Sequence, residues 1–426
     1  MNWETLPNRL DEPVLAGRAA SGLRVIMNPR PDWVRTFAAF GVNFGSIDRV
    51  GGTDGEPVPE GLAHFLEHKL FEDQRGDVSD RFATLGASTN AMTGFSGTTY
   101  IFSTIADPEP CLDLLLDFVQ EPWFTDELVE KEQGIIAQEI RMYDDDPDWR
   151  VFFGLLGCLY RSHPVKDNIA GSVESIRQID AATLRHCYDL FYHPNNLCLV
   201  VSGPMDPERV AELVDSDQAD RPRDSRPAHE RVVSDEPLGA IESRCALSLP
   251  VSRPRLLMGI KETVLGGSAR EQAKRKLATR VLLDLLLGRS SGGFESLYQD
   301  GLVDESFGVS YSSETGFGFT TAGGDTDEPE RLEQRLSEIF EAARRDGLDT
   351  AAFERIRNKL LGGMLRGVDS PESVAYQLLH GAFRGEAPFE ALELVDELTV
   401  ADLLERLEEH VRDEARAVAV VHPTEG

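Results

Sequence analysis

Residues 98–140 read TTYIFSTIADPEPCLDLLLDFVQEPWFTDELVEKEQGIIAQEI, and residues 317–365 follow the same pattern as FGFTTAGGDTDEPERLEQRLSEIFEAARRDGLDTAAFERIRNKLLGGML. Each copy reads as an alternating strand, a turn around Asp-Pro or Glu-Pro, an amphipathic helix, a short break and a second helix. Each half then ends on a helix followed by a Val-rich strand, in residues 175–204 and 395–423. The pattern predicts two degenerate repeats of one structural unit.

Strands and long helices also interleave outside these two stretches. Further strands are expected at Leu23–Met27, Thr36–Val42 and Leu256–Ile260. The chain shows no regular run of short repeats, which favours layered α+β packing over a doubly wound parallel sheet. The predicted fold class is therefore α+β, with two homologous halves that are each a mostly antiparallel sheet packed with helices.

A composition break divides the chain into halves of similar length. Residues 215–239 read DSDQADRPRDSRPAHERVVSDEPLG, which is polar, charged and proline-bearing, as interdomain linkers are. A chain of 426 residues is also long enough for two domains. We expect one domain over residues 1–214, a linker over residues 215–239 and a repeat domain over residues 240–426.

Composition limits the partners and the location of the chain. A formal net charge of −31 repels nucleic acid and anionic lipid, so neither is expected as a partner. No apolar run reaches the roughly 18 residues of a membrane span. The N-terminal MNWETLPNRLDEPVL lacks the features of a secretory signal, and the five cysteines form no C-x-x-C pair. We expect a cytoplasmic protein; whether its acidity reflects a high-salt cytoplasm stays open.

Residues 61–71, GLAHFLEHKLF, place His64, Glu67 and His68 in the order H-x-x-E-H, the inverted zincin order. The apolar spacing, with no glycine or proline after Gly61, predicts a helix. Residues three and four apart share a helix face, so both imidazoles can reach one ion. Zinc suits such donors, and Glu67 beside the ion would serve as general base.

Two alternatives stay open on this pattern alone. Five-residue patterns arise by chance, and two histidines and a glutamate can simply occupy an exposed helix face. Copper, nickel and iron also accept imidazole and carboxylate ligands, so the spacing does not choose the metal.

A helix predicted at Glu127–Met142 carries the candidates for a further ligand. Glu132 and Glu139 are seven residues apart, which is two helical turns, so they lie on one stripe. The alternative is a solvated face that also carries Lys131 and Arg141. The predicted apolar face of this helix consists of Leu128, Ile135, Ile136 and Ile140.

The H-x-x-E-H motif, followed about seventy residues later by a Glu-x6-Glu helix, resembles the pitrilysin/insulinase family of zinc metallopeptidases. Three more segments are similar to family signatures: GASTNAMTGFSGTTYIF at residues 86–102, HPVKDNIAGSVESI at 163–176 and FYHPNNLCLVVSG at 191–203. The resemblance covers most of the first half, while the second half matches by architecture. The chain looks like the small, two-domain bacterial subunits of this family, which are similar to processing peptidases.

The resemblance implies roles at the matching positions, with Zn²⁺ as cofactor. His64, His68 and Glu139 match the metal ligands, and Glu67 matches the catalytic base. Glu132 matches a carboxylate that orients a ligand. The resemblance thus favours a metal site over an exposed helix face.

The resemblance also implies where peptide substrate binds. Asn90 and Ala91 match positions beside the bound peptide. They belong to a strand, Ser88–Thr93, that matches the edge to which substrate adds as a further strand through main-chain hydrogen bonds.

One family feature is missing from the second half. Family members carry an arginine after a leucine, and a tyrosine seven residues later, which hold the substrate carbonyl. Here Tyr298 follows Leu297, and Glu305 stands seven residues later. The second half also lacks H-x-x-E-H, and the position equivalent to Glu139 falls close to Met364.

The sequence therefore predicts a zinc-dependent endopeptidase that hydrolyses unfolded peptides in a closed chamber. The missing Arg/Tyr pair predicts a dimer, preferably a heterodimer with a sister subunit that supplies the pair. The alternative is a non-catalytic assembly or peptide-binding subunit that retains a vestigial metal site. The sequence does not reveal the physiological substrate.

Overall fold

The computed structural model describes residues 1–51, 57–219, 221, 226–231 and 235–424. The chain forms two compact units, and each unit draws on both halves of the sequence. Unit 1 contains Met1–Ile140, Asn168–Glu230 and Leu365–Glu390; unit 2 contains Arg141–Asp167, Arg231–Met364 and Ala391–Gly426. In the described part of the chain, no helix combines the length and apolar character that a membrane span requires.

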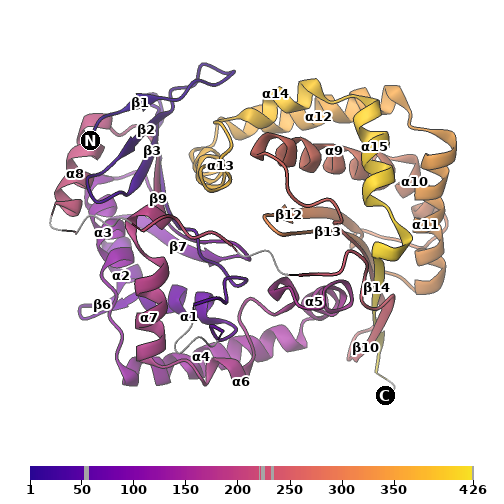
Figure 1. Cartoon of the computed structure of the whole chain (residues 1–426), viewed down its shortest axis with the longest axis horizontal. Coiled ribbons are helices and arrows are strands. Elements are labelled where there is room, and N and C mark those ends of the chain that lie inside the picture. The colour runs from indigo at the N-terminus through magenta and orange to yellow at the C-terminus, as the bar shows by residue number, and fades with distance from the viewer. Residues whose placement is uncertain (52–56, 220, 222–225, 232–234, 425–426) are drawn as a thin grey trace. The chain divides into compact units, whose positions relative to one another are not determined.

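Unit 1 is built on a seven-stranded sheet with the order β1-β2-β3-β9-β4-β8-β7 (Figure 1). The pair β3/β9 is parallel, and the other neighbouring pairs are antiparallel. The interior strand β4 is buried along its whole length and has the predicted bounds. The strands are β1 Glu4–Thr5, β2 Leu15–Arg18, β3 Arg24–Pro29, β4 Thr36–Val42, β7 Ala87–Thr93, β8 Thr98–Thr104 and β9 Leu197–Gly203, with a separate small hairpin of β5 Glu72–Asp73 and β6 Gly76–Asp77.

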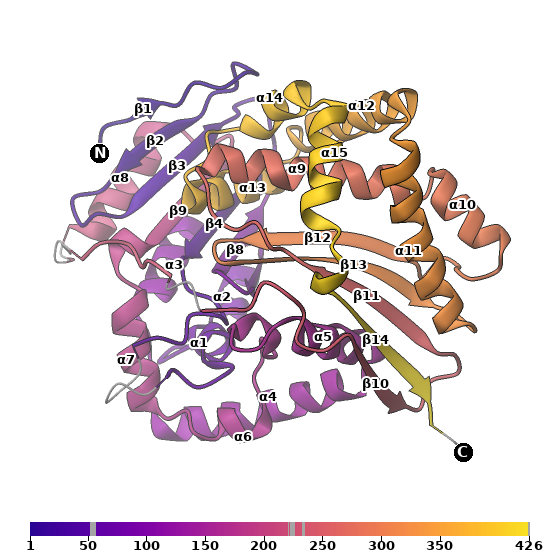
Figure 2. The ribbon, with the colours of Figure 1, turned by 45° about the vertical axis from the view of Figure 1, so that its right-hand side comes forward.

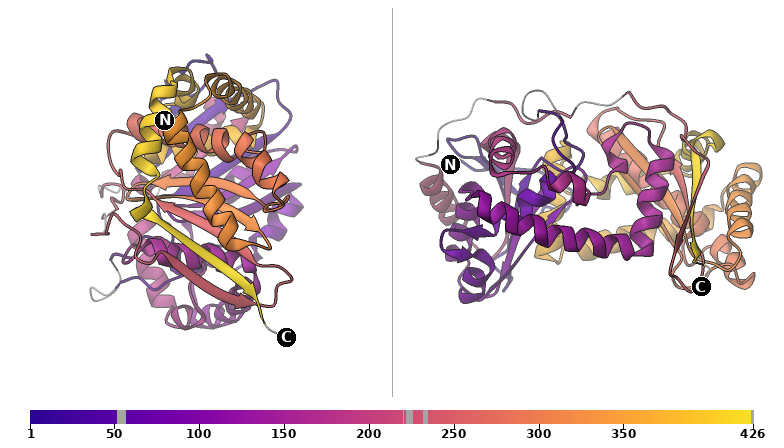
Figure 3. Two further views of the ribbon diagram at one scale, coloured as in Figure 1. Left: turned by 90° about the vertical axis from the view of Figure 1, so that its right-hand side faces the viewer. Right: turned by 90° about the horizontal axis from the view of Figure 1, so that it is seen from below.

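Unit 2 is built on a five-stranded sheet with the order β10-β14-β11-β13-β12, whose long strands lie side by side in Figure 2. The parallel pair here is β10/β14, which forms one edge in the left view of Figure 3. The other pairs are antiparallel. The strands are β10 Arg244–Leu249, β11 Arg255–Lys261, β12 Gly308–Glu314, β13 Phe317–Asp325 and β14 Arg416–Pro423.

The two sheets confirm the predicted repeat. The order β3-β9-β4-β8-β7 in unit 1 corresponds to β10-β14-β11-β13-β12 in unit 2, with the one parallel pair in the same place. In both copies the fourth strand of this order is followed in sequence by two helices, α3 and α4 after β8, and α11 and α12 after β13. The fold is α+β with two homologous halves, as predicted.

Helices pack on both sheets. Those of unit 1 are α1 Leu62–Leu70, α2 Val78–Thr84, α3 Glu109–Gln120, α6 Val173–Ile176, α7 Ala181–Phe191, α8 Pro207–Gln218 and α13 Pro371–Arg384, with the short η3 Pro194–Asn196. Those of unit 2 are α5 Pro147–Leu159, α9 Ala269–Leu287, α10 Gly292–Gln299, α11 Pro329–Asp346 and α15 Val400–His410, with η2 Pro164–Lys166 and η4 Asp413–Ala415. Three helices span a boundary between units: α4 Asp126–Asp145, α12 Thr350–Gly367 and α14 Glu390–Glu397.

Each sheet is packed by one helix from the opposite half of the sequence. Helix α13 contacts β3, β4 and β9 in unit 1, whereas α5 contacts β10, β11 and β14 in unit 2. Both contacts involve a glycine in an interior strand, Gly41 in β4 and Gly259 in β11. A Cβ on Gly41 would lie 2.6 Å from a methyl carbon of Leu379, and one on Gly259 would lie 2.8 Å from a methyl carbon of Leu155. Glycine thus lets the helix from the opposite half of the sequence approach each sheet closely.

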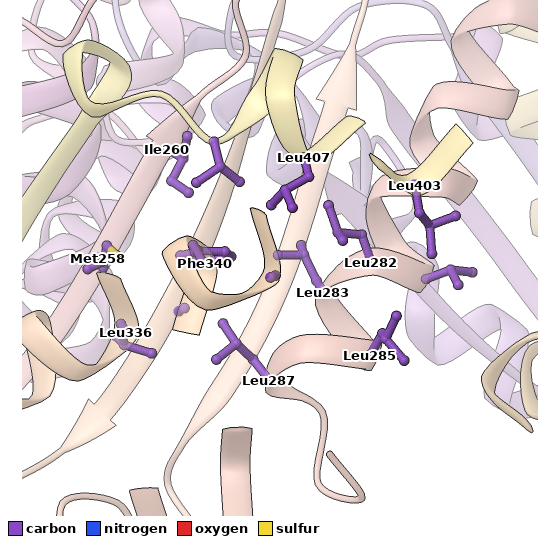
Figure 4. Packing of buried hydrophobic residues seen from close by; sticks show 14 of the residues in the cluster. Met258, Ile260, Leu282, Leu283, Leu285, Leu287, Leu336, Phe340, Leu403 and Leu407 are labelled. Atoms are coloured by element: carbon purple, nitrogen blue, oxygen red, sulfur yellow. The ribbon is translucent and has the colours of Figure 1, made fainter. Parts of the chain in front are cut away.

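Apolar side chains between the sheet and the helices of unit 2 form one continuous core (Figure 4). Strand β11 contributes Met258 and Ile260, and α9 contributes Leu282 and Leu283. Helix α11 contributes Leu336 and Phe340, and helix α15 contributes Leu403 and Leu407. Burial of such side chains is the main stabilising contribution to the unit.

The predicted linker begins inside a helix, because α8 continues to Gln218. Residues 220, 222–225 and 232–234 lie outside the described residues. Helix α5, from the first half of the sequence, belongs to unit 2, and helix α13, from the second half, belongs to unit 1. The compact units are therefore not continuous in sequence. The division into domains at residues 1–214 and 240–426 therefore stays a prediction about sequence halves. Each compact unit includes residues from both of these halves.

Candidate metal centre

Helix α1 presents one apolar and one polar face, as its sequence predicts. The apolar face packs into unit 1, where the buried residues are Leu62, Phe65, Leu66 and Leu70. His64, Glu67 and His68 lie outside this face and are only partly buried. Their spacing of three and four residues places the three polar side chains together on the helix.

The start of α1 is fixed by a glycine. Gly61 has a φ of 82°, in the left-handed region that disfavours residues with a side chain. A Cβ at this position would lie 2.3 Å from the carbonyl oxygen of Ala170. The first residue before the helix therefore packs against the backbone of Ala170. This contact fixes the position of His64, about one turn later.

Helix α4 supplies two carboxylates. Glu132 is buried, whereas Glu139 is partly exposed. The predicted apolar face was wrong at Ile135, which is 45% exposed, since the buried residues of this helix are Val129, Glu132, Ile136, Ala137 and Ile140. The buried stripe of α4 thus includes Glu132, whose carboxylate requires polar partners.

The structure brings His64, His68 and Glu139 together. Nε2 of His64 lies 3.7 Å from Oε1 of Glu139, and Nε2 of His68 lies 3.5 Å from its Oε2. One ligand atom from each residue lies within 4.8 Å of the others. Tetrahedral zinc with bonds of about 2.0–2.2 Å separates its ligand atoms by roughly 3.4 Å. Two imidazole nitrogens and a carboxylate at these distances suit a zinc ion.

The protonation of the two histidines differs. Burial and the nearby His68 lower the pKa of His64 to about 4, against the opposing effect of the carboxylates. Burial also lowers the pKa of His68, but the hydrogen bond and charge of Glu132 outweigh it, so that the net shift is upward. His64 is therefore neutral at pH 7 and offers a lone pair to a metal. His68 is protonated in a larger fraction of molecules, and metal binding would release that proton.

Glu67 lies on the same face and is held by a residue that the sequence analysis did not single out. Oγ1 of Thr93, at the end of β7, donates a hydrogen bond of 2.6 Å to Oε2 of Glu67. Burial raises the pKa of Glu67, and this hydrogen bond works in the opposite direction. A carboxylate with a raised pKa is a better proton acceptor at neutral pH.

Glu132 connects His68 to a buried lysine. Oε1 of Glu132 lies 3.1 Å from Nδ1 of His68, and its Oε2 lies 3.6 Å from Nζ of Lys69. Lys69 is 0% exposed and also lies 2.8 Å from a carboxylate oxygen of Glu72. No role for Lys69 was predicted from the sequence. A usable signal was present, since Lys69 follows Phe65 by four residues and thus occupies the apolar stripe of the helix.

The predicted substrate residues lie on an edge strand. Strand β7 is the last strand of the seven-stranded sheet and pairs only with β8 within the described residues. Asn90 is exposed and pairs in register with Ile101, while Ala91 pairs with Tyr100. Strand β7 also contacts α1. The position on an edge suits strand addition, and the substrate role of both residues stays a prediction.

The described residues of the second half hold no equivalent centre. Tyr298, at the end of α10, is 60% exposed, and Glu305 is also exposed. Met364 lies on α12, the counterpart of α4. Among the described residues, the group of His64, His68 and Glu139 is the one set of three metal-binding side chains close enough to share an ion.

Sequence comparison identifies the family. Residues 49–173 match the family model described as Insulinase (Peptidase family M16), and residues 178–360 match the one described as Peptidase M16 inactive domain. A Bacillus subtilis protein named as an uncharacterized zinc protease, YmfH, is 39% identical over 97% of this chain and 98% of its own length. The chain belongs to the M16 family, whose members are insulinase- and pitrilysin-like.

Solved structures agree with this membership. An M16-like peptidase candidate from Alicyclobacillus acidocaldarius superposes with a TM-score of 0.93 at 38% identity, covering 98% of this chain and 100% of that one. Pitrilysin matches the fold with a TM-score of 0.78 at 17% identity. All of this chain corresponds to 47% of the pitrilysin chain.

Proposed function

We propose that the chain is a zinc-dependent endopeptidase that hydrolyses unfolded peptides. The observation that supports this most is the convergence of His64, His68 and Glu139 from two helices, with Glu67 beside them on α1. The relatives are named as uncharacterized zinc proteases, and these names and the family match point in the same direction.

Each residue has a defined part in this proposal. His64, His68 and Glu139 would hold the metal. Zinc bound by such ligands polarises a carbonyl and lowers the pKa of a water molecule to about 7. Glu67 accepts a proton from the attacking water and later returns it to the leaving amine. Glu132 fixes the ring orientation of His68 through Nδ1.

Substrate binds, in this proposal, as an extended strand along β7. The main chain of an edge strand offers unpaired N–H and C=O groups to a peptide. Asn90 and Ala91 lie on this strand, three and two residues respectively before Thr93, which contacts Glu67. A peptide on β7 would therefore pass close to the general base. Only an extended, unfolded segment can pair in this way.

We further propose a closed chamber completed by a second subunit. Three observations support it: the chain corresponds to 47% of pitrilysin, residues 178–360 match a model described as an inactive domain, and Tyr298 and Glu305 stand where an arginine and a tyrosine are expected. A heterodimer with an Arg/Tyr-bearing sister would supply the missing carbonyl-binding groups, whereas a homodimer would not.

Metal loading tests the proposal directly. The purified chain, stripped of metal and then titrated with Zn²⁺, should bind about one ion tightly and cleave quenched fluorescent peptides, and a chelator should stop cleavage. His64→Ala and His68→Ala should lose both properties. His186→Ala, an exposed histidine on α7, is the matched control and should retain them. A wild-type chain that binds no zinc would overturn the proposal.

The second candidate is a non-catalytic assembly or peptide-binding subunit with a vestigial metal site. The family model described as an inactive domain over residues 178–360 favours it. This candidate predicts zinc binding without hydrolysis, and no hydrolysis after addition of any sister subunit. Zinc-dependent cleavage that Glu67→Gln abolishes would exclude it.

A further inference from the structure

We propose that Thr93 is a positioning residue that orients the carboxylate of Glu67 for proton transfer. The inference rests on the proposed function, because it needs Glu67 to act as the base. Thr93 is not a ligand of the metal in this account and forms no bond with substrate. The side-chain contact that carries this effect is the hydrogen bond from Oγ1 of Thr93 to Oε2 of Glu67 at 2.6 Å.

The geometry divides the two carboxylate oxygens of Glu67 between two tasks. Hydrogen bonds between a hydroxyl and a carboxylate are short and directional, about 2.5–2.7 Å, and this contact is in that range. The backbone N–H of Thr93 also acts on the Glu67 carboxylate, in the same direction as the hydroxyl, so Thr93 addresses this carboxylate with both of its donors. With Oε2 held, the rotation of the carboxylate is restricted, and Oε1 is left to accept the proton of the attacking water.

Thr93 can hold Glu67 because its own strand end is fixed. Thr93 closes the β7–β8 hairpin and pairs in register with Thr98. The N–H of Gly94 donates to the carbonyl of Gly97 at 2.8 Å, and Oγ1 of Thr98 donates to the carbonyl of Phe44 at 3.0 Å. Both contacts limit movement of the hairpin end.

A neighbouring loop is also hydrogen-bonded to the turn that follows Thr93. The N–H groups of Ser46 and Ile47 each donate at 3.1 Å, to the carbonyls of Gly94 and Phe95 respectively. A Cβ on Gly45 would lie 2.4 Å from the carbonyl oxygen of Phe95, so only glycine allows this approach. The hydroxyl of Thr93 is thus presented to Glu67 from a rigid hairpin, as precise positioning of a base requires.

The side chain of Thr93 could instead serve only the stability of the hairpin. That role would affect folding and metal binding along with activity. An orienting role affects kcat selectively, because the base is needed in the transition state but does not bind the ground-state peptide. The two roles therefore predict different kinetic patterns.

The test uses three variants of the full-length chain, with zinc loaded and peptide cleavage measured under steady-state conditions. Thr93→Val keeps the shape and removes the hydroxyl, and Thr93→Ser keeps the hydroxyl. Thr104→Val is the matched control, since its Oγ1 donates to the carbonyl of Gly86 at the opposite end of the same hairpin. Zinc stoichiometry and Tm are recorded for each variant.

We expect Thr93→Val to lower kcat by about 10- to 100-fold, as misplacement of a catalytic group does, with KM and zinc content unchanged. Thr93→Ser should restore kcat to within about threefold of wild type, and Thr104→Val should leave it unchanged. Crystals of Thr93→Val should show a rotated Glu67 carboxylate.

Three results would overturn the inference. The first is a kcat of Thr93→Val within twofold of wild type. The second is equal losses in Thr93→Val and Thr93→Ser, which would show that the hydroxyl is not the cause. The third is a parallel fall in Tm and zinc content. Failure of the proposed function is distinct, because the wild-type chain itself would then show no zinc-dependent cleavage, and both proposals would fall.

Discussion

Nδ1 of His68 lies 3.1 Å from Oε1 of Glu132, although the two residues are 64 positions apart in sequence and on different helices. The contact fixes the orientation of the imidazole, whose Nε2 then faces Glu139 at 3.5 Å. A carboxylate behind a histidine ligand selects the tautomer and increases the basicity of the ligating nitrogen. In the proposed metal centre, Glu132 would therefore matter as well as the three proposed ligands.

Replacement of Glu132 should weaken zinc binding without abolishing it. We expect Glu132→Ala to raise the zinc Kd by about 10- to 100-fold, the usual effect of losing the partner of a ligand. Competition with a chromogenic chelator measures the change. Glu130→Ala, an exposed carboxylate on the same helix, is the control and should bind zinc like wild type. An unchanged Kd for Glu132→Ala would show that the carboxylate has no part in the centre.

Local structure was predicted closely because hydrophobic periodicity determines it. The predicted strand Thr36–Val42 has the observed bounds, and the helix predicted over residues 61–71 forms at Leu62–Leu70. The repeat was visible for the same reason, since both copies must bury equivalent faces. The exchange of α5 and α13 was not predicted, because an amphipathic pattern shows that a helix packs on a sheet but does not show which sheet.

At the candidate site, the spacing of His64, Glu67 and His68 on one helix was sufficient to place them together. Glu139 required the family resemblance, because nothing in its own helix relates it to α1. Thr93 and Lys69 were missed, since their contacts depend on how a hairpin and a second helix pack against α1. Such partners are set by tertiary structure and not by local spacing.

Charge should influence substrate choice. A chain with a net charge of −31 attracts cationic peptides over long range, and salt screens the attraction over a Debye length of about 8–10 Å. We expect basic peptides to have a kcat/KM several-fold above that of acidic peptides of equal length at low salt, with a smaller ratio at high salt. Equal rates at low ionic strength would mean that the acidity serves solubility alone.

A sister subunit should raise activity. Loss of one group that stabilises a developing oxyanion costs about 10²–10³-fold in kcat, and this chain carries Tyr298 and Glu305 in place of the expected pair. We therefore expect the zinc-loaded chain alone to cleave slowly, and addition of an Arg/Tyr-bearing family subunit to raise kcat by at least tenfold. Mutation of the sister's arginine should reverse the gain. Full activity from a chain shown by sedimentation to be monomeric would contradict the proposed need for a sister subunit.

Glu236 should stabilise unit 2 in a pH-dependent manner. Its carboxylate accepts hydrogen bonds of 2.6, 2.8 and 2.9 Å from the N–H groups of Arg161, Ser162 and His163, and one of 2.9 Å from buried Lys261. Burial alone would raise the pKa of Glu236, but these donors outweigh it and lower the pKa to about 2.

A group with a depressed pKa in the folded state stabilises the protein above its unfolded pKa, which is 4.5 for glutamate. The stabilisation by Glu236 is thus complete above about pH 5 and is lost as the pH falls toward 2. Glu236→Gln should lower the free energy of unfolding at pH 7 by about 1.5–3 kcal/mol, and the difference from wild type should shrink at pH 3. Urea unfolding at both pH values checks this, with exposed Asp235→Asn as control. A deficit of equal size at both values would contradict the assignment.

We propose Glu67 as the base of a zinc peptidase whose metal ligands are His64, His68 and Glu139. The most direct test measures zinc content and peptide cleavage of Glu67→Gln beside wild type. Because Glu67 is not a ligand in this account, the variant should bind zinc with wild-type stoichiometry and lose at least about 10²-fold in kcat. Cleavage at the wild-type rate by zinc-loaded Glu67→Gln would contradict the account.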